Sequence, residues 1–327
     1  MTLKSYIKLF VKQSVFEPPR NRFKIHILNI LGIQIIRYII KNILFYTKKK
    51  NFSNNLSLKN NKIFNIELYN QFQSDGIIII NNFLPQDKFD LINKFCLDFE
   101  KKNYFEQVNF GKKKVITGSI NFNQKDLSNR DIINKIFLET GINQFISKYL
   151  NIKVSSIPNI GYQSINLSDD FEDIEDDNSE YHADRFYPCI KVFLTLNDNT
   201  ISNGCYHYIK KSHRANFKRV KHEYFHSIYQ KNKLSKNKII NKDYQIRNGR
   251  LTFTEKYINR NYNLKNIIAC EAPKNSLVIS DNKGFHKRGY FKSSNIRRQL
   301  RFSYYDFQIP QVFQKIKKIY LDQKIKS

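Results

Sequence analysis

The chain has 327 residues and a mass of 39.1 kDa, with 41% hydrophobic and 26% charged residues. At roughly 100–200 residues per domain, this length fits one large domain with appended segments, or two domains. Its 27 Phe and 20 Tyr residues can fill a sizeable core, which excludes a wholly disordered chain. The sequence has neither an uncharged apolar run of about 18 residues nor a secretory leader pattern, so we expect no spanning helix and no secretion.

The formal net charge is +28 and the pI is about 9.8. A field of this size favours anionic partners such as nucleic acid, a membrane surface or phosphorylated substrates. The excess of Lys, Asn and Ile is nevertheless spread over the whole chain, and the aromatic residues do not alternate with basic ones as a base-stacking platform requires. We therefore interpret the charge as compositional and disfavour nucleic acid as a partner.

The four cysteines are widely spaced and form no CxxC pair: Cys96, Cys189, Cys205 and Cys270. This spacing is typical of reduced, buried thiols in a cytoplasmic protein rather than of a disulfide framework. It also argues against a zinc cluster, because no Cys pair stands at ligand spacing from a histidine. We expect a cytoplasmic location.

Residues 1–62 differ in composition from the rest and predict a basic N-terminal helical extension with a linker. Residues 23–46 have the pattern of an amphipathic helix with a wide apolar face, and three lysines follow at 48–50. Two interpretations have equal support: a peripheral membrane contact through residues 23–50, or a helix that packs on the domain. The polar residues 51–62 predict the linker.

A compact domain is predicted over residues 63–310. It begins with a helix over Glu67–Asp75, which Gly76 ends, and the β-branched strand Ile77–Ile80. Pro85 then starts a second helix, since proline is well tolerated in a first helical turn.

Beyond residue 150 the sequence predicts mostly strands, over residues 152–154, 160–165, 190–196, 277–279 and 300–305. The basic residues 215–265 predict a long insertion, and residues 311–327 a basic C-terminal tail. The acidic run 169–177 is expected to be a solvated loop, with a lid over a cationic substrate group or over the basic insertion as the alternative. The whole pattern indicates a mainly β domain with flanking helices.

A His-x-Asp pair carries the chemistry. On a strand, residues i and i+2 point to the same face, so His182 and Asp184 present an imidazole and a carboxylate side by side. These are two of the three ligands of a two-His-one-carboxylate site for non-haem Fe(II). His286, which follows the predicted strand Leu277–Ile279, is the candidate third ligand. Arg297 opens the next strand and could offer a guanidinium fork to the distal carboxylate of a dicarboxylate co-substrate.

With these residues, the sequence resembles the phytanoyl-CoA dioxygenase-like family of Fe(II)/2-oxoglutarate-dependent oxygenases. The resemblance covers roughly residues 64–307 and is specific at the level of the family. Three blocks carry it: Asp75–Leu84; His182–Asp184 with the strand after it, Asn203-Gly204 and Ser212-His213; and Asp281–His286 with Arg297 and Tyr304.

The resemblance implies a double-stranded β-helix, a jelly-roll-type barrel with iron at its mouth. Matching motif positions implies that His182, Asp184 and His286 are the metal ligands. It also implies that Arg297 clamps 2-oxoglutarate.

The implied reaction is hydroxylation by O2, with Fe(II), with 2-oxoglutarate as co-substrate and with ascorbate as an optional reductant. The substrate is an unidentified small molecule or a lipid- or glycan-linked compound. Gln163 and Asn166 match a polar strand that contacts co-substrate or substrate in the family. Because Asp184 leaves no ligand position vacant for a halide, hydroxylation is favoured over halogenation.

Two departures from the family pattern affect the expected site. Lys211 stands where the family has a second glycine before Ser-His, so we expect that turn to differ. An apparent extra residue within 287–289 leaves the register of the arginine open, with Arg298 and Arg301 as substitutes for Arg297. Strand alternation places Arg297 and Arg301 on one face, which disfavours Arg298.

Two other classes of protein fit the same sequence. One is a non-catalytic basic barrel that binds a membrane surface or nucleic acid, and the other is a cupin-like metalloenzyme that does not use 2-oxoglutarate. Steep salt dependence of nucleic-acid binding, without bound iron, would favour the first. Two further histidines are assigned structural roles: His213 in a turn and His207 in cross-strand packing.

Overall fold

The structure is a computed structural model that describes residues 61–102, 107–110, 113–121, 127–150, 153–155, 157, 160–167, 180–184, 189–214, 219, 251–290 and 296–305. The predicted N-terminal extension up to residue 60, the acidic run 169–177 and the tail 311–327 lie outside the described residues, as does most of the insertion 215–265.

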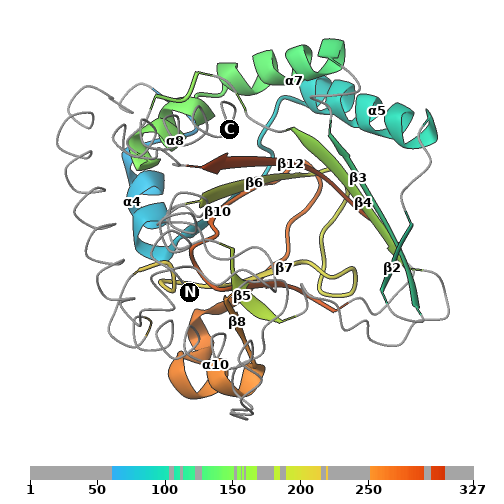
Figure 1. The fold of residues 1–327 in the computed structure, drawn as a ribbon. Helices are drawn as coiled ribbons and strands as arrows, with labels where there is room; N and C mark the ends of the chain where they lie inside the picture. Colours follow the sequence, from blue (N-terminus) through green and yellow to red (C-terminus); the bar gives the residue numbers. More distant parts are fainter. Residues whose placement is uncertain are drawn as a thin grey trace, which may run out of the picture.

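Two antiparallel sheets form the centre of the molecule (Figure 1). The larger sheet contains, in spatial order, β1 (Ile77–Ile80), β10 (Leu277–Asp281), β6 (Cys189–Thr195), β12 (Arg297–Tyr305), β4 (Gly161–Leu167), β3 (Lys113–Asn121) and β2 (Gln107–Phe110). The smaller sheet contains β8 (Leu251–Phe253), β5 (Tyr181–Ala183), β11 (His286–Arg288), β7 (Tyr206–Ile209) and β9 (Ile267–Cys270).

The chain crosses between the sheets in the order of a double-stranded β-helix. From β4 to β7 it alternates between the larger and the smaller sheet, and after β9 it alternates again through β10, β11 and β12. This strand order is a jelly-roll topology, so the predicted fold class is confirmed. Among the described residues no strand ladder joins the two sheets, so hydrogen bonds do not close the barrel.

The helices flank this sandwich. Four of them, α4 (Ile66–Asp75), α5 (Gln86–Lys102), α7 (Leu127–Glu139) and α8 (Ile142–Leu150), lie along the larger sheet (Figure 1). Helix α10 (Glu255–Asn261) and the short 3₁₀ helix η1 (Leu264–Asn266) belong to the segment between β8 and β9. In the described parts of the chain, no helix combines the length and the apolar character needed to cross a bilayer.

The two faces of the larger sheet differ in chemistry, and this difference positions the site. In β12, Leu300 and Phe302 pack into the core that the sheet shares with the helices. Phe193 of β6, by contrast, packs with Tyr208 of the smaller sheet. Because successive strand residues point to opposite faces, Arg301, which pairs with Phe193, faces the smaller sheet.

Local sequence explains the first elements. The side chain of Asn65 caps α4 by accepting a hydrogen bond from the backbone N–H of Leu68 at 2.8 Å. Gly76 ends the helix in the left-handed conformation, with φ 77°. A Cβ at this position would lie 2.4 Å from Nδ1 of His213, so glycine is required for packing as well.

Most of the predicted elements are confirmed, and one strand prediction is wrong. The predicted helix at 67–75 and the strand at 77–80 correspond to α4 and β1. The strand predicted over 152–154 fails, because Lys153 and Val154 have no strand structure. The N–H of Val154 instead donates to Oγ of Ser147 in α8 at 3.0 Å, which uses the group a strand ladder would need.

Candidate metal centre

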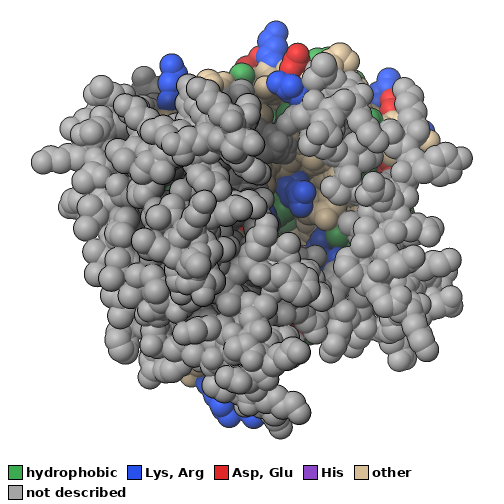
Figure 2. All heavy atoms as spheres, in the orientation of Figure 1, with side chains coloured by type: hydrophobic (Ala, Val, Ile, Leu, Met, Phe, Trp, Pro, Cys, Tyr) green, Lys and Arg blue, Asp and Glu red, His purple; other side chains and the backbone are tan. Residues whose placement is uncertain are grey.

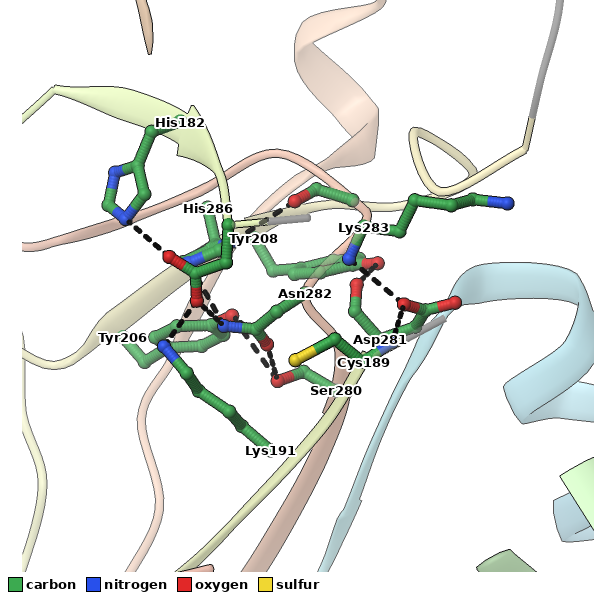
Figure 3. A network of polar contacts seen from close by, with 12 residues as sticks. His182, Cys189, Lys191, Tyr206, Tyr208, Ser280, Asp281, Asn282, Lys283 and His286 are labelled. Carbon is green, nitrogen blue, oxygen red and sulfur yellow. Dashed lines mark hydrogen bonds and ion pairs between the residues drawn. The ribbon is translucent and has the colours of Figure 1, made fainter. Parts of the chain in front are cut away.

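Two histidines and one aspartate converge on the smaller sheet. His182 in β5 lies directly opposite His286 in β11, and Asp184 follows β5. Nε2 of His182 lies 3.7 Å from Oδ1 of Asp184, and Nε2 of His286 lies 3.5 Å from Oδ2 (Figure 3). One ligand atom from each of the three residues falls within 4.8 Å of the others, a cluster that could hold a metal ion.

Backbone carbonyls fix both imidazole rings. Nδ1 of His182 lies 2.8 Å from the carbonyl oxygen of Glu180, and Nδ1 of His286 lies 3.0 Å from that of Gly284. A carbonyl only accepts, so each Nδ1 carries a proton, and Nε2, which lies towards Asp184, is the nitrogen that could bind a metal. Burial, the main influence, lowers the pKa of His286 against the opposing effect of Asp184, which favours the neutral ligand form.

Asp184 is held as a carboxylate. Burial alone would raise its pKa, but the positive charge of Lys191 and the contact with His286 hold the pKa well below its usual value. Lys191 of β6 reaches across from the larger sheet and forms an ion pair with Oδ2 of Asp184 (Figure 3). The centre therefore joins side chains from both sheets.

Asn282, which the sequence analysis did not identify, lies at the middle of the cluster. Its Nδ2 donates to Oδ2 of Asp184 at 2.9 Å and lies 3.0 Å from Nε2 of His286. Its Oδ1 accepts from Oγ of Ser280 at 2.8 Å and from the hydroxyl of Tyr206 at 3.1 Å, which fixes the orientation of the amide. The sequence analysis did not identify Lys191 as a site residue either. For both residues, the only sign in the sequence was their position close to a predicted metal-ligand motif.

The predicted co-substrate residues lie on β12 and β4, apart from the cluster. Arg297 opens β12 opposite Ile165, and its Nη1 donates to the carbonyl oxygen of Gly204. Gln163 accepts a hydrogen bond from Nε2 of Gln299 at 2.6 Å. Asn166 lies in β4 opposite Ile116, and its side chain lies outside the described residues.

The two substitute arginines face opposite ways. Arg298 pairs with Glu100 of α5, with Nε 2.8 Å from Oε2, so it points to the helices and away from the cluster. Arg301 shares the inward face of Arg297 by strand alternation. The prediction that disfavoured Arg298 is therefore consistent with this arrangement.

His207 and His213 lie outside the metal cluster. His207 in β7 pairs with Lys287, whose ammonium group contacts Glu255 of α10. Both side chains therefore lie on the face of the smaller sheet that is turned away from the larger sheet. Nε2 of His213 lies 3.1 Å from the carbonyl oxygen of Gln73. Nearby, Lys211 has a left-handed backbone with φ 67°, a region that favours glycine.

Comparisons with known proteins give distant likenesses only. No family profile and no curated protein matches the sequence. Among solved structures, the non-heme alpha ketoglutarate dependent epimerase SnoN from nogalamycin biosynthesis has 10% identity and a TM-score of 0.46, over 73% of this chain and 81% of that one. EctD from S. alaskensis with bound Fe has 12% identity and a TM-score of 0.44, over 77% and 80%. HygX from Streptomyces hygroscopicus, with nickel and 2-oxoglutarate bound, has 11% identity and a TM-score of 0.42, over 73% and 86%. Likenesses this low transfer no activity to this chain.

Proposed function

We propose that this protein is an Fe(II)/2-oxoglutarate-dependent oxygenase, of the phytanoyl-CoA dioxygenase-like type, that hydroxylates a small-molecule or lipid- or glycan-linked substrate. The observation that carries the proposal is the convergence of His182, Asp184 and His286, whose ligand atoms lie within 4.8 Å of one another. Two imidazoles and one carboxylate on one face of a metal are typical of non-haem Fe(II) oxygenases, since they leave positions open for reactants.

The chemistry of the donor set supports this choice of metal. Both histidines direct Nε2 to the cluster, the lowered pKa of His286 favours its neutral form, and Asp184 is ionised, which suits the binding of a divalent cation. The carbonyl partners of the two Nδ1 atoms are the outer contacts that usually orient metal-bound imidazoles. When bound, iron and 2-oxoglutarate would supply the oxidising power for the reaction with O2.

The chain's own groups would bind and orient the reactants. Arg297 is the proposed partner of the distal carboxylate of 2-oxoglutarate, with Gln163 and Asn166 on the adjacent strand as further polar contacts. Lys191 would hold Oδ2 of Asp184, which limits the ways in which this carboxylate can turn towards a metal. Together these groups restrict the arrangement of the reactants.

The test is spectroscopic and needs no substrate. Fe(II) and 2-oxoglutarate are added to the full chain without oxygen, and a metal-to-ligand charge-transfer band is sought. His182→Ala should abolish the band, and on admission of O2 it should abolish succinate formation. The matched control is His207→Ala, a strand histidine that faces away from the cluster, and it should keep both signals.

The alternatives give different results in the same experiment. Iron that binds with normal affinity, but without a band on addition of 2-oxoglutarate, would indicate a metalloenzyme that does not use this co-substrate. A chain that binds no iron would exclude the oxygenase. An unchanged band in His182→Ala would remove this residue from the ligand set.

A further inference from the structure

We propose that Arg301 binds an acidic group of the primary substrate, so that the substrate is a carboxylate-, sulfate- or phosphate-bearing compound. This inference rests on the proposed function, because it concerns the same region between the two sheets. It goes beyond that function by naming the chemical class of the molecule that is oxidised.

Arg301 faces the interior, and its side chain has no partner among the described residues. It pairs with Phe193 of β6, which packs between the sheets, so alternation directs Arg301 to the same side. Arg301 is half-buried, and its side chain forms no hydrogen bond or ion pair with any residue that the structure describes. Lys191 and Arg297 differ, because the first contacts Asp184 and the second the carbonyl oxygen of Gly204.

The strand register places Arg301 beside the metal cluster. Ser303, two residues further along β12, lies opposite Lys191, whose ammonium group contacts Asp184. Two residues along a strand span roughly 6.6 Å, so Arg301 is one step along the sheet from the row that touches the cluster. On its other side Arg301 lies opposite Gly161 of β4, which has no side chain to fill the adjacent space.

The charges on this face are unbalanced. Among the described side chains, the inward face of the larger sheet carries Lys191, Arg297 and Arg301 and no carboxylate. Figure 2 shows Lys or Arg side chains within a hollow near the middle of the molecule. In the proposed function the two carboxylates of 2-oxoglutarate match the metal and Arg297, while Lys191 remains with Asp184. Of the three described cations on this face, Arg301 is therefore left for the substrate.

A guanidinium fork suits this role. Arginine is always charged, and its parallel N–H groups match the oxygens of carboxylate, sulfate and phosphate. A half-buried arginine between two sheets meets a lower dielectric than a surface arginine, so its attraction for an anion is larger there. An acidic substrate would therefore be oriented by one contact at Arg301 while its reactive carbon faces the metal.

The experiment separates co-substrate binding from substrate binding. The full chain is loaded with Co(II) as a redox-inert metal, and 2-oxoglutarate binding is measured by calorimetry. Methyl phosphate, inorganic sulfate and acetate are then titrated as minimal acidic probes into the loaded protein, with glycerol as the neutral probe. The variants are Arg301→Gln, Arg301→Lys and Arg297→Gln, with Arg260→Gln in the exposed last turn of α10 as the control.

We expect Arg301→Gln to lower the affinity for the tightest-binding acidic probe at least tenfold. The affinity of this variant for 2-oxoglutarate should stay within about twofold of that of the parent chain. Arg301→Lys should recover part of the probe affinity, and Arg260→Gln should change neither. Comparing the three probes distinguishes a phosphate or sulfate group from a carboxylate. Arg297→Gln should instead lower the affinity for 2-oxoglutarate.

Three results would overturn the inference. In the first, the loaded chain binds no acidic probe more tightly than glycerol. In the second, probe binding is the same in Arg301→Gln as in the parent chain. In the third, Arg301→Gln would lose 2-oxoglutarate while Arg297→Gln keeps it, so that Arg301 would be the co-substrate clamp. Failure of the proposed function looks different, since the parent chain itself would then bind no 2-oxoglutarate in the presence of Co(II).

Discussion

Lys211 is a lysine in a backbone conformation that glycine adopts at little cost. Its φ is 67°, and its N–H donates to the carbonyl oxygen of Asp75 at 2.9 Å, which holds the turn after β7 against the end of α4. A left-handed conformation costs a residue with a Cβ about 1–2 kcal/mol. Replacing Lys211 with glycine would remove this cost, but glycine loses more conformational entropy on folding, which offsets part of the gain. The strain persists because the turn is tied to α4.

We therefore expect Lys211→Gly to raise the free energy of unfolding by about 0.5–1 kcal/mol, measured by urea denaturation. Lys274→Gly is the matched control, since this exposed turn lysine has no left-handed backbone and gains nothing from glycine. A destabilised Lys211→Gly would mean that the lysine side chain contributes more than its backbone strain costs.

His213 predicts a pH dependence of stability. Burial lowers its pKa to about 4, from an ordinary value near 6.5. The contribution of neutral His213 to the free energy of unfolding is therefore complete above pH 6.5, where this histidine is also neutral in the unfolded chain. It is lost as the pH falls from 6.5 to about 4, because the unfolded state binds the proton more readily. A difference of this size corresponds to about 3 kcal/mol between the two limits.

The measurement is the free energy of unfolding at pH 7.5 and at pH 4.5 for the parent chain and for His213→Gln. Carboxylates titrate over the same range in both proteins, so the comparison isolates the histidine. The parent should lose more stability than the variant between these two pH values. Equal losses would show that His213 is as easily protonated in the folded protein as in the unfolded chain.

At the scale of elements, one polar cluster fastens α5 to the larger sheet. Glu100 of α5 accepts hydrogen bonds from Arg298 of β12 at 2.8 Å and from the hydroxyl of Tyr162 of β4 at 2.5 Å. Burial raises the pKa of Glu100, but these hydrogen bonds outweigh it and lower the pKa overall. The helix is thus joined to two adjacent strands by one carboxylate.

We expect Arg298→Met to destabilise the fold by about 2 kcal/mol, because it leaves a partly buried carboxylate with one partner fewer. A double-mutant cycle with Glu100→Gln should show a clear coupling energy by urea denaturation. The exposed pair Lys88–Glu139, between α5 and α7, should show a smaller coupling. Binding of Co(II) and 2-oxoglutarate should not change in Arg298→Met, and a loss there would return Arg298 to the candidate clamps.

The sequence predicts elements best where one local pattern decides them. The β-branched run of β1 and the glycine that ends α4 are both of this kind. The short strands β5 and β11, three residues each, are too brief to show a period, and only their histidines draw attention to them. The failed strand at 152–154 also contains two β-branched residues, Ile152 and Val154, but the side chain of Ser147 in α8 accepts the hydrogen bond of the Val154 N–H group.

For the whole molecule, convergence of the site depends on register, which no local pattern contains. His182 and His286 meet because β5 and β11 pair at that one position. The ligand types could be proposed from the sequence, since each belongs to a motif. Asn282 and Lys191 could not, because their contacts with Asp184 exist only once the two sheets are packed together.

This dependence on packing predicts that metal binding stabilises the whole fold. The three ligands come from β5, the residue after it and β11, so unfolding either strand destroys the site. A ligand that binds only the folded state adds about 2.7 kcal/mol at 100 times its Kd, which for a domain of this size raises Tm by about 5–10 °C. We expect Mn(II) to produce this rise by calorimetry and a chelator to reverse it. Asp184→Asn should lose most of the rise and His207→Gln should keep it. An equal rise in Asp184→Asn would place the bound metal elsewhere on the chain.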